Sequence, residues 1–313
     1  MEVVTQALQL IAAVAAAPLF LGWINQCRAW LQNRRAPSLW LPYRGIRKLF
    51  HKDAVIAESA SPLFRMSPYV VFAAMVVAAG IIPSMGTHLP FTMAADAIAL
   101  VGLLATARVF LALSAMDIGT AFGTLGARRE MMVGFLAEPA LLMVIFVASG
   151  ISATTALPAI TENLATQTLA VYPSLAFTAV AFTLVLLAEN ARIPIDNPAT
   201  HLELTMIHEA MLLEYSARHL ALMEWASALK LFNYACIGFA LFIPWGVSTG
   251  EGGPVALLGS IPLLAAKLAV TGAGLALIET LSAKLRVFRA PEFLAIAFLL
   301  AVLGLLVHLL LGA

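Results

Sequence analysis

Eight long stretches of this sequence are almost free of charge, and each is long enough to cross a lipid bilayer. A hydrocarbon core about 30 Å thick is spanned by about 20 apolar residues in helical form. In lipid the backbone must satisfy its own hydrogen bonds, so such stretches become helices. The sequence therefore predicts an all-α integral membrane protein with about eight transmembrane helices. These are expected at residues 3–25, 68–87, 93–114, 131–150, 169–189, 225–246, 255–279 and 291–311.

The composition excludes a soluble globular chain. Only 11% of the 313 residues are charged and 62% are hydrophobic, whereas a soluble domain carries about 25% charged residues. Residues 1–313 are therefore expected to form a single membrane domain. The first basic residue is Arg28, so the first stretch lacks the basic start of a cleaved signal peptide and is expected to remain as a helix. A formal net charge of +1 gives no sign of a nucleic-acid partner.

Lysine and arginine are concentrated on one side of this predicted topology. Of the 18 basic residues, 15 lie in four segments, and the other three, Arg108, Lys230 and Lys267, lie inside predicted spans. Basic loops stay in the cytoplasm, so we expect a multi-pass protein of the inner (cytoplasmic) cell membrane with both termini on the non-cytoplasmic side. The four predicted cytoplasmic loops are residues 26–66, 115–130, 190–224 and 280–290.

Two further segments lie outside the predicted spans. Between Tyr43 and Val55, apolar residues recur at helical spacing among basic ones, which predicts a short amphipathic helix on the membrane surface. It could be an anchor among lipid headgroups or a docking surface for a soluble partner. Residues 151–168 show only a weak pattern and are expected to form a coil.

Charged residues inside a membrane are costly and tend to be functional. Glu138 and Lys267 lie deepest in their predicted spans, which favours a role in a polar pathway. Glu189 and Glu279 lie near span ends, where capping or snorkelling explains them equally well.

The loop between the fifth and sixth spans is unusually acidic. Residues 189–224 hold six carboxylates against two arginines. From His201 onward the pattern is helical, and at about 100° per residue Glu203 and Glu214 fall on one face. Their neighbours are mostly Leu, Met and Ile, so we expect acids without countercharges in a partly buried, wet cavity. Such acids have raised pKa values and can exchange protons near neutral pH.

Further acids in the fourth span and in the loop before it extend this pattern into the bilayer. The sequence thus predicts a path of protonatable groups from the cytoplasmic face. Its candidate members are Asp117, Glu130, Glu138, Glu189, Asp196, Glu203, Glu209, Glu214, Lys267 and Glu279.

No metal site is predicted. His208 and Glu209 begin like an HExxH motif, but Leu212 stands where the second histidine is required. Cys27 and Cys236 are far apart and lack CxxC spacing.

Several motifs resemble the membrane subunit that borders the quinone chamber of respiratory complex I. They are AENARIPID at residues 188–196, NRRAP at 33–37 and KLFHK at 48–52. Other segments more closely resemble the membrane subunit of group 4 membrane-bound [NiFe] hydrogenases, of the formate hydrogenlyase and hydrogenase four type. These are HLELTMIHEAMLLEYS at 201–216, LGARREMM at 125–132 and AKLRVFRAPE at 283–292.

This resemblance implies a non-catalytic subunit with no redox centre of its own. It would anchor a soluble arm of hydrogenase-like large and small subunits and an iron–sulfur subunit. That arm would hold the iron–sulfur clusters and, where it is retained, a [NiFe] centre. Electron transfer in the arm would be coupled to ion movement in antiporter-like membrane subunits. Arg192 would be the countercharge that holds the acidic loop, and the docking residues for the arm would be Arg34, Arg35, Arg44 and Lys48.

Three other functions stay open at this point. A quinone-reactive complex I subunit would be inhibited by quinone analogues. A stand-alone secondary ion transporter would be active alone, although the inverted repeat that is common in such proteins is not evident. In a pure scaffold the intramembrane acids would be dispensable. The sequence does not distinguish H⁺ from Na⁺ as the ion that moves.

Overall fold

The chain is built of α-helices in the part that the structure, a computed structural model, describes. The described residues are 2–87, 90, 96–166, 173–196, 206–248, 253–285 and 289–311. The helices are α1 (Glu2–Leu31), α2 (Leu41–Phe50), α3 (Pro62–Ile81), α4 (Ala97–Asp117), α5 (Ala121–Ser152), α6 (Leu157–Thr166), α7 (Pro173–Glu189), α8 (His208–Leu212), α9 (Ala217–Phe242), α10 (Gly253–Leu281) and α11 (Ala290–Leu311).

Seven of the described helices are long and apolar enough to cross a membrane, namely α1, α3, α4, α5, α9, α10 and α11. The eighth predicted span corresponds to α7, a shorter apolar helix of 17 residues. Its predicted start at residue 169 lies outside the described residues. The prediction of an all-α, multi-pass membrane protein is therefore confirmed.

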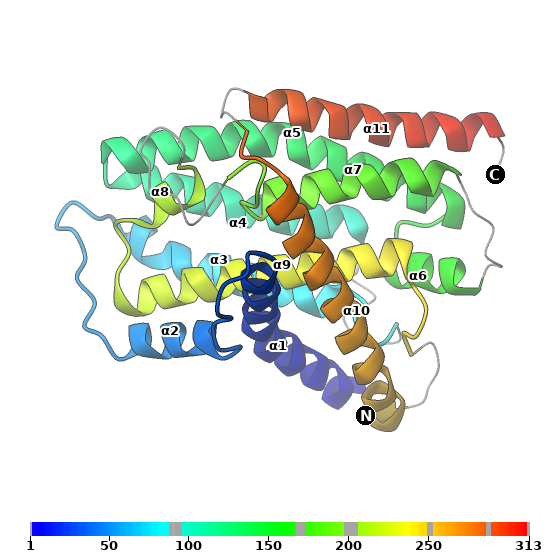
Figure 1. The fold of residues 1–313 in the computed structure, drawn as a ribbon, viewed down its shortest axis with the longest axis horizontal. Coiled ribbons are helices and arrows are strands. Elements are labelled where there is room, and N and C mark those ends of the chain that lie inside the picture. The colour runs from blue at the N-terminus through cyan, green and yellow to red at the C-terminus, as the bar shows by residue number, and fades with distance from the viewer. Residues whose placement is uncertain are drawn as a thin grey trace.

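The long helices form one bundle. In Figure 1, α3, α4, α5, α7, α9 and α11 run along the long axis of the molecule, and α1 and α10 cross it obliquely. Contacts join α1 with α10, α3 with α4 and α9, and α11 with α5 and α7. Each apolar helix thus buries part of its surface against neighbours and leaves the rest for lipid or partner subunits.

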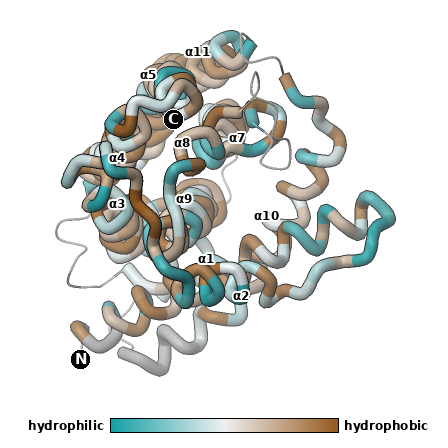
Figure 2. Tube along the Cα trace, turned by 90° about the vertical axis from the view of Figure 1, so that its left-hand side faces the viewer, coloured by the Kyte–Doolittle hydropathy of each residue, from teal (hydrophilic) through white to brown (hydrophobic). Residues whose placement is uncertain are grey.

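The bundle has two chemically different ends. We call the end that carries α2, α8 and the described basic residues of the four loop segments the basic face, and the other end, with α6, the opposite face. In Figure 1 both ends of the described chain lie toward the opposite face. Figure 2 looks onto the basic face, where α2 and α8 lie in front of the ends of the longer helices.

Two segments differ from their prediction. Residues 151–168 contain the helix α6, so the prediction of a coil there is wrong. Five side chains of α6, among them Leu157 and Ile160, are buried against the bundle. Helix α5 begins at Ala121, ten residues before the predicted span, because Thr120 caps it by accepting a hydrogen bond from the backbone N–H of Gly123. Glu130 therefore lies within a long helix and not at the end of a loop.

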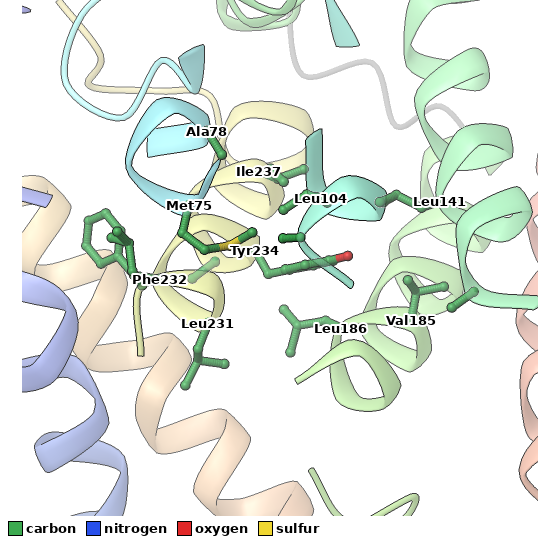
Figure 3. Packing of buried hydrophobic residues seen from close by; sticks show 14 of the residues in the cluster. Met75, Ala78, Leu104, Leu141, Val185, Leu186, Leu231, Phe232, Tyr234 and Ile237 are labelled. Atoms are coloured by element: carbon green, nitrogen blue, oxygen red, sulfur yellow. The ribbon is translucent and has the colours of Figure 1, made fainter. Parts of the chain in front are cut away.

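The hydrophobic core lies where five helices meet. Figure 3 shows Met75, Leu104, Leu141, Leu186 and Tyr234, one each from α3, α4, α5, α7 and α9. Tyr234 is 1% exposed, and its hydroxyl points toward α5 and α7. This side of the core borders the charged residues described next.

Candidate functional site

A buried ion-pair cluster lies between α4, α5, α7 and α9. Arg108 of α4 is 5% exposed and forms close ion pairs with Glu138 of α5 and Glu189 of α7. Its Nε lies 3.7 Å from an oxygen of Glu130, also on α5. Lys230 of α9 places its Nζ 3.0 Å from the second oxygen of Glu189. We call these five residues the membrane cluster.

A glycine makes room for the central arginine. A Cβ atom added at Gly134 of α5 would lie 2.7 Å from Cδ and 2.9 Å from Cζ of Arg108. The Arg108 side chain therefore lies directly across the backbone of α5, between the helix positions that carry Glu130 and Glu138. Only a residue without a side chain permits this approach.

The charges of the membrane cluster do not balance. Two cations, Arg108 and Lys230, face three carboxylates, so the fully ionised cluster carries 2 − 3 = −1. An uncompensated charge is unfavourable in a low-dielectric interior. One added proton removes it, so the cluster is suited to bind and release a single proton.

A second ion-pair group lies nearer the basic face. Glu279 of α10 is buried, with an oxygen 3.1 Å from Nη1 of Arg192 and the other 3.5 Å from Nη1 of Arg28. Burial lowers the pKa of the Arg192 guanidinium, and the charge of Glu279 opposes that shift. These contacts tie the loop after α7 to α1 and α10.

Asp196 holds the start of α8 in place. It is 3% exposed, and one of its oxygens accepts hydrogen bonds from the backbone N–H groups of Ile207 and His208 at 3.3 and 3.1 Å. Its other oxygen lies 3.4 Å from Nζ of Lys284. This carboxylate therefore fixes the position of His208.

Two adjoining cavities connect the basic face with the membrane cluster. The outer cavity has a volume of about 460 Å³, and its lining includes Arg192, Glu209 and Glu224. The inner cavity, about 30 Å³, is lined by Arg108, Glu130 and Lys230 among others, and its size suits one or two water molecules. Both cavities share three lining residues, which are His208, Leu212 and Ser227. A route lined by both polar and apolar side chains thus leads from the basic face into the bundle.

The structure brings most of the predicted path residues to this route. Glu130, Glu138 and Glu189 belong to the membrane cluster, and Glu209 lines the outer cavity. Asp196 lines the outer cavity as well, and Glu279 pairs with two of its arginines. Glu203 lies outside the described residues.

Three predicted path residues lie elsewhere. Asp117 accepts a hydrogen bond from the backbone N–H of Ser61 at 2.9 Å, at the start of α3. Lys267 donates to the carbonyl oxygens of Ile243 and Trp245, both at 2.6 Å, just beyond the end of α9 toward the opposite face. Glu214 is half-buried in the segment between α8 and α9.

Two expectations about the acidic loop are wrong. The helix expected to carry Glu214 is interrupted, because α8 ends at Leu212 and α9 begins at Ala217. The acids are also not all without countercharges, since Glu189 and Asp196 each have a basic partner within 3.5 Å. Those partners come from other helices and from the α10–α11 loop, where the loop's own composition gives no hint of them.

Arg108 and Lys230 lie inside predicted spans but are not among the predicted path residues. Their position within apolar stretches was the available signal, since such charges are rarely without a partner. Arg28 and Lys284 were likewise counted only as loop charges. In the described part of the chain, no group of three or more His, Cys, Asp or Glu residues could hold a metal ion.

The residues predicted to dock a soluble arm all lie on the surface of the basic face. Arg34 and Arg35 follow α1, and Arg44 and Lys48 project from α2, which buries Ile46 against the bundle. Helix α2 ends at Phe50, so the amphipathic helix predicted for residues 43–55 is confirmed in its first part only.

Comparison with known proteins agrees with this architecture. Residues 5–310 match the family model described as NADH dehydrogenase. The chain is 36% identical over 239 residues to hydrogenase-4 component C of Escherichia coli (strain K12), covering 76% of this chain and 74% of that protein. It is 32% identical over 293 residues to formate hydrogenlyase subunit 4 of the same organism, covering 93% and 94%.

A solved structure shares the fold. It is a chain of the membrane-bound sulfane sulfur reductase, an archaeal respiratory membrane complex, with a TM-score of 0.82 and 19% identity, covering 97% of this chain and 99% of that one. The family match spans nearly the whole sequence and includes every residue of the membrane cluster. The chain therefore belongs to the NADH dehydrogenase family, that of the complex I membrane subunit.

Proposed function

We propose that this chain anchors a soluble redox arm at the membrane and couples electron transfer in that arm to proton movement. The observation that carries the proposal is the membrane cluster, a largely buried group of five charges with one net negative charge. It lies at the inner end of a polar route that starts at the basic face. A scaffold alone would gain nothing from such a group, because buried ion pairs are weak contributors to stability.

The two curated relatives suggest the nature of the arm. One is a component of hydrogenase-4 and the other a subunit of formate hydrogenlyase. By analogy, the arm consists of hydrogenase-like large and small subunits and an iron–sulfur subunit, and these partners hold all redox centres. It rests on the exposed basic residues around α2, on the cytoplasmic side of the inner cell membrane. Antiporter-like membrane subunits complete the complex.

The geometry suggests the order in which a proton passes. Protons enter the outer cavity from the basic face and reach the inner cavity past His208 and Ser227. There one proton binds the carboxylates around Arg108 and cancels the net charge. The Glu138 side chain is 33% exposed, whereas that of Glu189 is 1% exposed. Glu138 is therefore the member of the cluster that can pass the proton sideways to a neighbouring membrane subunit.

Replacing Glu138 with glutamine tests this function, because the amide keeps the shape of the side chain and cannot bind a proton. In the complete complex reconstituted into vesicles, Glu138→Gln is expected to abolish proton movement. Electron transfer should stay within about twofold of the unaltered rate. Glu58→Gln, which changes an exposed acid between α2 and α3, is the matched control. Normal proton movement in Glu138→Gln would contradict the proposal.

One observation favours a second candidate, reaction with a quinone. The outer cavity, at about 460 Å³, is in the size range of small-molecule sites, and Arg28 and Arg192 could donate hydrogen bonds to a quinone carbonyl. A quinone analogue that inhibits electron transfer in the unaltered complex, and loses this effect in Arg28→Met, would support that candidate.

A further inference from the structure

Two buried amide side chains lie on the other side of the membrane cluster and play no part in the route described above. Gln9 of α1 and Asn233 of α9 are both 0% exposed. Asn233 donates through Nδ2 to the carbonyl oxygen of Met75 at 2.9 Å. Gln9 donates through Nε2 to the carbonyl oxygens of Ala79 and Ile82 at 3.4 and 3.1 Å. Both amides thus bind the backbone of α3.

The oxygen atoms of these amides have no hydrogen-bond partner among the described residues. Fully buried acceptors of this kind are rare in proteins, and most of those that occur are satisfied by bound water. An apolar side chain of similar size would pack there without that penalty. Two such oxygens in one seam between α1, α3 and α9 therefore point to water as their ligand.

The seam runs in a definite direction. The α3 carbonyls that the amides bind, at residues 75, 79 and 82, lie on successive turns that lead toward the opposite face. Asn233 follows Lys230 of the membrane cluster by three residues on α9, so the two side chains are neighbours on the helix surface.

At the other end of the seam, Ser84 donates its backbone N–H to the same Ile82 carbonyl that Gln9 binds. The Ser84 hydroxyl is a third buried polar atom without a partner in the described residues. Gln6, one turn from Gln9 on α1, binds the carbonyl oxygen of Gly80 at 3.0 Å. Polar groups therefore continue to the loop after α3 at the opposite face.

We propose that Asn233, Gln9 and Ser84 border an outlet of bound water that joins Lys230 to the opposite face. The membrane cluster is then reached by water from both sides, through the two cavities on one side and this seam on the other. The ligand is a chain of water molecules held by amide and hydroxyl oxygens. That the chain carries protons rests on the proposed function, but the existence of the outlet does not.

The two water routes meet at the ion pair between Lys230 and Glu189. While that pair is intact, the ammonium group of Lys230 repels a hydrated proton at the junction. A proton can cross only when the pair is rearranged, so two water routes need not make the membrane leak. In this arrangement Lys230 prevents free passage of protons between the two water routes.

Cysteine accessibility tests the outlet directly. In the complete complex, Cys27 and Cys236, both buried and free, are first replaced by alanine. Gln9→Cys and Asn233→Cys are then exposed to a small, charged methanethiosulfonate reagent added from the opposite face. Only hydrated thiolates react readily, so both positions are expected to react about tenfold faster or more than dry positions.

The controls are Ala13→Cys on α1 and Ala228→Cys on α9, which are 1% and 2% exposed and lie near the test residues. Equal, slow reaction at all four positions, or reaction only from the basic face, would overturn the outlet. If either amide variant fails to assemble, the other decides the question together with Ser84→Cys, which is nearly isosteric. Because no transport is measured, this failure is distinct from failure of the proposed function, which Glu138→Gln tests.

Discussion

Arg108 determines the chemistry of the site because a single guanidinium serves three carboxylates from two other helices. Its planar fork can form close pairs with Glu138 and Glu189 at once while its Nε faces Glu130. A lysine has a single charged atom and cannot reach all three acids. The arginine thus keeps three acids together in a place where each alone would be strongly disfavoured.

Two substitutions of Arg108 distinguish the effect of its positive charge from the effect of its planar shape. Arg108→Met leaves three buried acids with only Lys230, and loss of one partner of a buried pair costs about 3–5 kcal/mol. Arg108→Lys keeps the charge and should assemble better than Arg108→Met, yet it should move protons poorly. The yield of assembled complex and proton movement in vesicles measure the two effects. If both variants assemble as well as the unaltered chain, this prediction is wrong.

At the scale of helices, the close approach of α4 and α5 holds the cluster together. Gly134 lies under the Arg108 side chain, and Pro139, which lacks a backbone N–H, interrupts the hydrogen bonding of α5 directly after Glu138. The two acids of α5 therefore lie on either side of the glycine, on a helix that is locally weakened.

Gly134→Ala is expected to displace the Arg108 side chain, since an added methyl group would overlap it. Overpacking of this kind costs about 1–3 kcal/mol. The same exchange in α4, Gly102→Ala, meets no atom within 4 Å and should be neutral or slightly stabilising. Thermal stability of the complex and proton movement should both fall in Gly134→Ala only. If the two variants behave alike, the tight contact described here is not important for the site.

Asp117 is expected to stabilise the start of α3. Because its carboxylate accepts the N–H of Ser61 at the start of α3, its role is expected to be structural. Asp117→Asn keeps an acceptor and should leave proton movement unchanged, whereas Asp117→Ala should lower stability by about 1 kcal/mol. Loss of proton movement in Asp117→Asn would instead place this residue in the proton path.

At the scale of the whole molecule, the two faces differ in charge and the membrane cluster lies between them. The basic face presents Arg34, Arg35, Arg44 and Lys48 to solvent. Exposed charges like these contribute through long-range attraction, which salt screens. They are therefore suited to hold an acidic surface of a soluble arm without fixing it rigidly.

Replacing these four basic residues by glutamine should loosen the arm. Each exposed contact is worth about 0.2–1 kcal/mol, so the four together should weaken retention of the soluble subunits by about fourfold or more. Added salt should weaken retention of the soluble subunits in the unaltered complex, and should do so much less in the variant. Gln32→Ala, in the same exposed segment, is the control. Retention that does not depend on these residues or on salt would exclude this surface.

Much of the fold follows from local sequence, and much of the site does not. The membrane-spanning helices could be predicted because a span is recognised from its apolar composition and its length alone. The acids were found because carboxylates among apolar residues are unusual. Their partners were missed because Arg108 meets Glu138 across 30 positions and Lys230 meets Glu189 across 41. The short helix α6 was missed because its 10 residues are too few to span a bilayer, which was the criterion that identified the other helices.

If the Lys230–Glu189 junction controls proton passage, the double variant Lys230→Met/Glu189→Gln should lose coupled proton movement. This variant removes one charge of each sign and leaves the cluster at −1. The measurement is protons moved per electron pair in vesicles that hold the complete complex. The expected result is assembled complex with continued electron transfer and no coupled proton movement. An unchanged ratio of protons to electrons would contradict the claim.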